Sequence, residues 1–143
     1  MLASAGFKAP VQSRLVNEIW LKLVGNATLN PVSAITRATL GALLASSESR
    51  DLMRSLMEEV DAVARSLGVE LPVSIDKRIE GAASVGAHKT SMLQDLEAGK
   101  PLELDALLGA VIEIAEWKQV DVPRLRVLYG LARLTAAAAR PAG

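Results

Sequence analysis

The chain has 143 residues, with 16 basic and 16 acidic side chains, one histidine and no cysteine. This length fits a single domain with a core of its own. The balanced charge and the scarcity of aromatic residues, 3% of the chain, argue against a nucleic-acid partner, which requires a basic excess and rings on which bases stack. Without cysteine there are no disulfides, and one histidine excludes a multi-histidine metal centre.

Proline and glycine divide the sequence into segments of helical length, in which apolar residues recur every three or four positions. The predicted helices cover approximately residues 13–29, 31–45, 49–67, 74–85, 91–98, 102–118 and 123–140. Asn30 and Pro31 predict the start of the second helix, as N-cap and first helical residue. Gly68 predicts the end of the third. The alternating segment 69–75 is predicted to be an extended connection, because Pro72 removes a strand hydrogen bond and no partner strand is visible. The predicted fold class is all-α, an irregular multi-helix bundle.

The apolar content is high for a chain without a membrane segment. Apolar residues make up 50% of the chain, yet no apolar run reaches the ~18 residues of a membrane span. Residues 1–10 lack the apolar core of a secretory signal. We therefore expect no membrane partner and a cytoplasmic location, which the absence of cysteine also favours. The apolar excess predicts an interface as well as a core, and so a homo-oligomer, a dimer.

Three polar residues follow one edge of the first predicted helix. Lys22, Asn26 and Asn30 are spaced by four, which on a helix places them in one stripe ~12 Å long. The stripe borders the apolar face that contains Leu15, Ile19 and Leu23, which we expect to be buried. An ammonium and two amides there could bind a small polar ligand. A lysine at such an edge often extends to solvent, and asparagine is a natural cap, so spacing alone favours a structural role about two to one.

Ser91 and Glu103 form a second candidate set. Ser91 could bind an anion at the start of a short helix, although a capping box with Gln94 is the more frequent role of this pattern. Glu103 is predicted in the first turn of the helix 102–118, where an acidic side chain also suits the helix dipole. His88 is predicted in a loop, where a lone histidine is usually solvated. The sequence contains no glycine-rich phosphate or dinucleotide loop, so no cofactor-binding residue is expected.

These candidates lie in two longer strings that resemble a known family. The string from Trp20 to Ala34, with Lys-x3-Asn-x3-Asn-Pro at its centre, resembles the start of the C-terminal domain of ketopantoate reductases. The string from His88 to Asp105 resembles that family's second signature, although some members have asparagine in place of His88. The resemblance extends over nearly the whole chain. It implies an all-helical domain similar to the C-terminal domain of 6-phosphogluconate dehydrogenase.

The family, 2-dehydropantoate 2-reductase, uses NADPH to reduce ketopantoate to pantoate in coenzyme A biosynthesis. The resemblance implies that Lys22 is the catalytic general acid and that Asn26 and Asn30 hold Lys22 or the substrate oxygens. It implies that Ser91 binds the substrate carboxylate and that Glu103 fixes the Lys22 ammonium and the substrate hydroxyl. Chemistry agrees with these roles, because hydride addition to a ketone leaves an oxyanion that an ammonium can stabilise and protonate.

In the family, a Rossmann domain precedes this domain and supplies the NADPH site. Only the segment 1–21 precedes Lys22, so we expect residues 1–143 to be the catalytic and substrate-binding domain, with the Rossmann domain absent. The chain alone would then bind no NADPH and be inactive. The substrate would be ketopantoate or a similar 2-keto acid. The alternative is a stand-alone helical oligomerisation module without catalysis.

Overall fold

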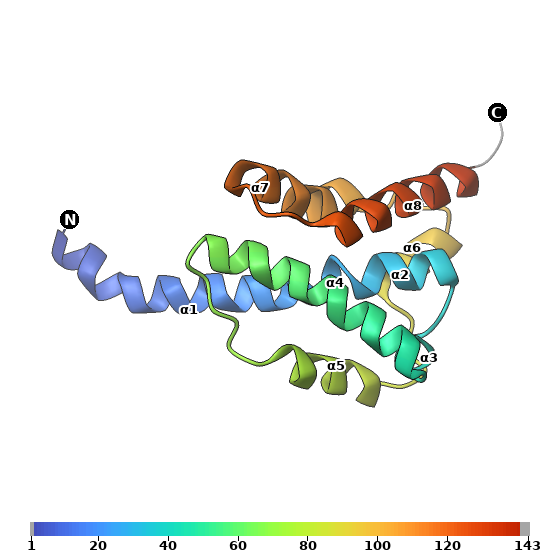
Figure 1. The fold of residues 1–143 in the computed structure, drawn as a ribbon, viewed down its shortest axis with the longest axis horizontal. Helices are drawn as coiled ribbons and strands as arrows, with labels where there is room; N and C mark the ends of the chain where they lie inside the picture. The colour runs from blue at the N-terminus through green and yellow to red at the C-terminus, as the bar shows by residue number, and fades with distance from the viewer. Residues whose placement is uncertain (1, 141–143) are drawn as a thin grey trace.

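A computed structural model describes the backbone of residues 2–140 and the side chains of residues 14–140. The ends of the predicted domain, residue 1 and residues 141–143, lie outside the described residues. No strand forms within residues 2–140, so the predicted all-α class is confirmed. The elements in chain order (Figure 1) are α1 (Leu2–Asn26), α2 (Leu29–Thr36), α3 (Leu40–Leu43), α4 (Ser47–Ser66), α5 (Ile75–Ser84), α6 (Ser91–Glu97), the π-helical turn η1 (Asp105–Gly109), α7 (Ala110–Lys118) and α8 (Pro123–Ala139).

Helix α4 lies at the centre of the bundle. It packs against α1, α5, α7 and α8, and in Figure 1 it runs between α7 and α8 above and α5 below. Helix α2 packs against both α6 and α8. The largest fully buried side chains of the main core are Leu44, Met53, Met57, Ile79, Leu108 and Leu125. A second, smaller cluster joins α6 to α2 and α8.

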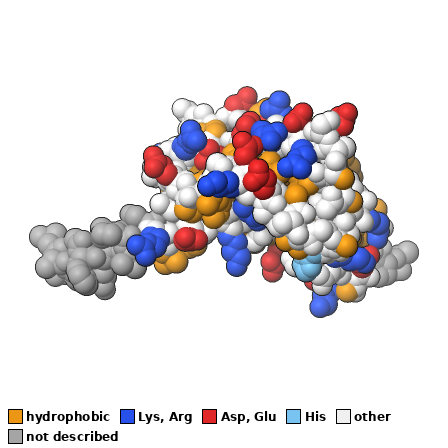
Figure 2. All heavy atoms as spheres, turned by 90° about the horizontal axis from the view of Figure 1, so that it is seen from below, with side chains coloured by type: hydrophobic (Ala, Val, Ile, Leu, Met, Phe, Trp, Pro, Cys, Tyr) orange, Lys and Arg blue, Asp and Glu red, His pale blue; other side chains and the backbone are white. Residues whose placement is uncertain are grey.

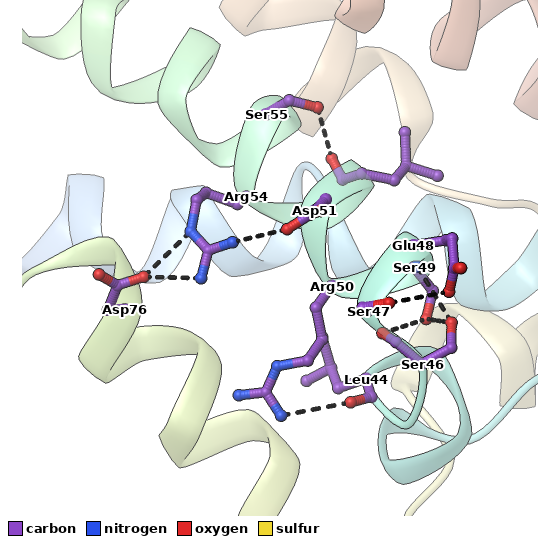
Figure 3. A network of polar contacts seen from close by, with 11 residues as sticks. Leu44, Ser46, Ser47, Glu48, Ser49, Arg50, Asp51, Arg54, Ser55 and Asp76 are labelled. Atoms are coloured by element: carbon purple, nitrogen blue, oxygen red, sulfur yellow. Dashed lines mark hydrogen bonds and ion pairs between the residues drawn. The ribbon is translucent and has the colours of Figure 1, made fainter.

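Polar contacts at the start of α4 also hold α5 in place (Figure 3). The Ser46 hydroxyl caps α4 by accepting a hydrogen bond from the Ser49 amide at 3.1 Å. Further along α4, Arg54 donates to the Asp76 carboxylate of α5 through Nε at 3.0 Å and Nη2 at 2.9 Å. Both nitrogens donate to the same carboxylate oxygen, Oδ1 of Asp76, and this contact links the first turn of α5 to α4.

A buried carboxylate of α4 caps the N-terminus of α8. Glu59 accepts hydrogen bonds from the backbone amides of Arg124 at 3.0 Å and Leu125 at 2.9 Å. These amides belong to the first turn of α8, where no partner exists within the helix. The residue before the helix, Val122, provides no side-chain cap. A long-range contact therefore replaces the local cap that most helix starts use.

The boundary between the first two helices differs from the prediction. Helix α1 ends at Asn26 and α2 begins at Leu29, so Asn30 is a helical residue and its predicted role as N-cap is wrong. The residue at the cap position is Thr28, whose hydroxyl donates to the Val24 carbonyl oxygen at 2.6 Å. The helix starts earlier than the Asn-Pro signal indicated because a proline is tolerated throughout the first turn, where amides lack helical partners.

The predicted helix 31–45 is also interrupted. It forms α2 and α3, with Arg37 in the left-handed region at φ 59° between them. Several other predictions are confirmed within a few residues. Gly68 ends α4 with φ 78°, residues 69–74 form a connection that is neither helix nor strand, with a bend at residues 72–73, and Ser74 caps α5. Helix α8 begins at Pro123 as expected.

The buried face of α1 differs from the expected one in its N-terminal half. Leu15 and Ile19 of the expected stripe are 59% and 54% exposed, whereas Trp20 and Val24 of the neighbouring stripe are buried. Only the C-terminal part of the expected stripe, Leu23 and Ala27, packs against the core. The helix carries two adjacent apolar stripes, and α2, α4 and η1 do not pack against both along their whole length. Periodicity reveals that a helix is amphipathic, but it does not decide between two neighbouring stripes.

Candidate functional site

Lys22 and Asn26 lie in the last two turns of α1. The Lys22 side chain is exposed and Asn26 is half-buried. Asn30 is half-buried in the first turn of α2, beyond a break at residues 27–28, so the continuous helical stripe predicted for the three residues is wrong. The break is one tight turn, in which the Ala27 amide still bonds the Leu23 carbonyl oxygen at 2.8 Å. The three polar residues therefore surround one helix junction.

Ser91 is the first residue of α6 and its side chain is exposed. The predicted capping box of Ser91 with Gln94 is wrong. Thr90 is the N-cap, and its hydroxyl accepts from the Leu93 amide at 3.1 Å. The Gln94 side chain instead donates to the Lys89 carbonyl oxygen at 3.1 Å. The Ser91 hydroxyl is consequently not used in capping the helix.

The cap residue also ties α6 to α2. Buried Thr90 donates to the Ser33 hydroxyl at 3.0 Å, and Ser33 donates to the Ala38 carbonyl oxygen at 2.8 Å. Because Ser33 lies one turn after Asn30, this chain of hydrogen bonds sets where Ser91 stands relative to the start of α2. The sequence did not indicate Thr90 as the N-cap, because a threonine beside a serine gives no local signal of which one caps the helix.

Glu103 lies in the connection between α6 and η1 and is exposed. Its predicted place in the first helical turn is wrong, because the helix begins at Leu104. The turn that follows is π-helical, a conformation that recurs at functional sites. Asp105 in this turn accepts a hydrogen bond from the Tyr129 hydroxyl of α8. That hydrogen bond raises the pKa of the Tyr129 phenol.

The elements that carry these residues are in contact with one another. Helix α1 packs against α2 and against η1, and α2 packs against α6. Among the side chains of residues 14–140, none of the five predicted site residues is joined to another by a hydrogen bond or an ion pair. All five are exposed or half-buried. They therefore present an ammonium, two amides, a hydroxyl and a carboxylate that a solute can reach.

The other functional features of the described residues are modest. No group of three or more histidine, aspartate and glutamate side chains within them is arranged to hold a metal ion. None of their helices is long and apolar enough to cross a membrane. The face seen in Figure 2 mixes basic and acidic side chains, with hydrophobic ones between them. A pocket of about 430 Å³ lies between the α6–η1 connection and the end of α8, but none of the five residues lines it.

Comparison with known proteins places this chain in a family. The family model described as ketopantoate reductase PanE/ApbA C terminal matches residues 14–136. The chain belongs to this family. The family resemblance predicted from the two sequence strings is thereby confirmed.

Relatives are similar in sequence and structure over most of the chain. It is 46% identical to a 2-dehydropantoate 2-reductase of Mesorhizobium japonicum over 132 residues, which cover 92% of this chain and 40% of the relative. The crystal structure of 2-dehydropantoate 2-reductase from Methylococcus capsulatus matches with a TM-score of 0.80 and 31% identity, over 88% of this chain and 44% of that one. A dimeric ketopantoate reductase from Staphylococcus aureus matches with a TM-score of 0.71 and 26% identity, over 86% and 44%. The chain thus spans less than half the length of these relatives.

Proposed function

We propose that this chain is the substrate-binding and catalytic part of a reductase that converts 2-dehydropantoate, or a similar 2-keto acid, to the 2-hydroxy acid. The observation that supports the proposal is that Lys22, Asn26, Asn30, Ser91 and Glu103 are accessible groups without partners among themselves, in a chain of this family. A helical bundle needs none of these residues for its core, because each of them is exposed or half-buried.

In this proposal Lys22 is the general acid. Its ammonium stabilises the oxyanion that forms on the ketone oxygen and gives it a proton. Glu103 holds the ammonium in place during the reaction, and the contact of α1 with η1 supports their proximity. Asn26 and Asn30 orient Lys22 or the substrate oxygens. Ser91 binds the carboxylate end of the substrate, which the contact of α2 with α6 supports.

The hydride would come from NADPH, which the described residues do not fit. They form no strand followed by a glycine-rich turn, the arrangement that holds a dinucleotide pyrophosphate. We propose that a Rossmann domain of the kind found in the family holds the nucleotide. The chain by itself would then supply the substrate contacts and the proton, and would show no turnover.

The test is steady-state reduction of ketopantoate by the reductase that contains this chain, compared with its Lys22→Ala variant. Loss of a general acid should lower kcat by about 10²–10⁴-fold, which is ~3–5 kcal/mol of barrier. The melting temperature should hardly change, because the Lys22 side chain is exposed. Lys118→Ala, at an exposed lysine whose ammonium lies over Trp117, is the matched control and should retain full activity. An unchanged kcat in Lys22→Ala would refute the assignment.

The second candidate is a helical oligomerisation module, and an apolar surface favours it. Three exposed side chains, Leu52, Val127 and Leu131, line a hollow between α4 and α8, and exposed Leu134 continues it along α8. If association were the whole function, Lys22→Ala would affect neither turnover nor assembly. We propose instead that the reductase uses such apolar residues to form a dimer, the state named for the Staphylococcus aureus relative.

A further inference from the structure

A second cation lies beside the candidate site, on a residue that no sequence motif indicated. The guanidinium of Arg78, from the first half of α5, lies against the backbone of α1 at Gly25. A β-carbon at Gly25 would stand 2.0 Å from one terminal nitrogen of Arg78 and 2.8 Å from the central guanidinium carbon. The guanidinium therefore occupies the space that any larger residue at position 25 would need.

The start of α5, which carries Arg78, is anchored by two sets of hydrogen bonds. The Ser74 hydroxyl caps α5 by accepting from the Lys77 amide at 3.1 Å. Arg54 clamps the Asp76 carboxylate to α4 (Figure 3). The first turn of α5 is thus capped by Ser74 and linked to α4 through Asp76. Arg78 lies two residues after Asp76. In Figure 1 this start of α5 lies beneath the C-terminal part of α1.

The Arg78 guanidinium has no anionic partner among the side chains of residues 14–140. Asp76, the acidic residue two positions before it, is engaged by Arg54 at 2.9 and 3.0 Å. Burial alone lowers the pKa of Arg78, and no carboxylate counteracts this effect. The guanidinium still remains charged, because arginine is protonated at any ordinary pH. A half-buried charge without a partner is costly, so an anion from outside the domain would stabilise it.

The place of Arg78 matches the shape of the proposed substrate. Gly25 is three residues from Lys22, and residues at this spacing are neighbours on a helix surface, ~5–6 Å apart. Asn26 follows directly. In a 2-keto acid the carboxylate is bonded to the ketone carbon, so the group that binds the carboxylate must lie close to the one that reaches the ketone oxygen. A guanidinium suits this task because its fork of donors matches the two carboxylate oxygens.

We propose that Arg78 binds the carboxylate of the 2-keto acid while Lys22 acts on the ketone oxygen, and that Gly25 leaves room for the guanidinium. This inference rests on the proposed function. Arg78 supplies the charge that selects an acid over a neutral ketone. Ser91 then adds a hydroxyl contact rather than the main attraction for the carboxylate.

The experiment measures steady-state kinetics of the reductase that contains this chain, with ketopantoate and with its uncharged methyl ester. Arg78→Met should raise KM for ketopantoate by about 10- to 100-fold, the effect of a lost hydrogen-bonded ion pair, with a much smaller change in kcat. With the methyl ester, Arg78→Met and the parent should have equal KM. Arg78→Lys keeps the charge but loses the fork of donors, so its KM for ketopantoate should lie between those of the parent and Arg78→Met.

Gly25→Ala tests the same idea without changing Arg78. The added methyl group would displace the guanidinium, which is the end of a flexible side chain. KM for ketopantoate should rise as in Arg78→Met, while the melting temperature stays the same or increases, because alanine favours a helix. Gly81→Ala is the matched control, since a β-carbon at this α5 position meets nothing within 4 Å. It should leave KM unchanged.

The outcomes separate the two proposals. If the parent reduces ketopantoate and Arg78→Met changes KM by less than about twofold, the role of Arg78 is refuted and that of Lys22 stands. If KM of Arg78→Met rises equally with ketopantoate and with its methyl ester, or if its melting temperature falls sharply, Arg78 is a structural residue and the inference is again refuted. If the parent reduces no 2-keto acid, the proposed function itself is overturned, and the role of Arg78 with it.

Discussion

Replacing Glu59 by alanine should destabilise the domain by about 4 kcal/mol. The carboxylate accepts from two backbone amides at the start of α8, and hydrogen bonds to a charged group contribute ~1.5–3 kcal/mol each. The Leu125 amide is buried and would lose a full partner, which costs ~3 kcal/mol. The Arg124 amide is partly buried, so water can replace its partner and ~1 kcal/mol is lost. The midpoint of thermal unfolding should fall by roughly 10–15 °C.

Urea unfolding followed by circular dichroism measures this free energy. Glu59→Gln keeps one carbonyl oxygen but loses the charge, and should cost about half as much. Glu58→Ala is the matched control, because Glu58 is the exposed neighbour on the same helix and should shift stability by less than ~0.5 kcal/mol. A loss below ~1 kcal/mol in Glu59→Ala would mean that the carboxylate does not cap α8 in solution.

Two further predictions concern the surface of the domain. Tyr129 is the single tyrosine of the chain, and its hydrogen bond to Asp105 raises the pKa of its phenol. The hydrogen bond should persist below that pKa and break as the pH rises through it. An ultraviolet absorbance titration should therefore have a lower midpoint in Asp105→Asn, and equal midpoints would contradict the contact. The chain should also associate through its exposed apolar residues, so sedimentation at high concentration should detect a dimer that Leu131→Glu weakens by at least ~10-fold. The control is Val73→Glu, which should leave association intact. Val73 is 37% exposed and lies in the connection before α5. A strictly monomeric parent chain would contradict the proposal.

Local signals in the sequence account for some helix ends. Gly68 ends α4 because glycine adopts the positive φ of 78° without strain. Pro123 begins α8 because its fixed φ and missing amide suit the first helical position. These choices depend on a few consecutive residues, so they can be read without knowledge of the fold. The spacing of Lys22, Asn26 and Asn30 likewise indicated the family, since a motif is a property of the chain.

Contacts between distant residues decided other features of the fold. The choice of the buried stripe on α1 depended on where α2 and α4 pack. The cap on α8 came from Glu59, 65 residues earlier than Arg124. Arg78 and Gly25 lie 53 residues apart in the sequence, and neither has a local feature that predicts their contact. Helical periodicity specifies which residues share a face, whereas the partner of that face is a property of the packed structure alone.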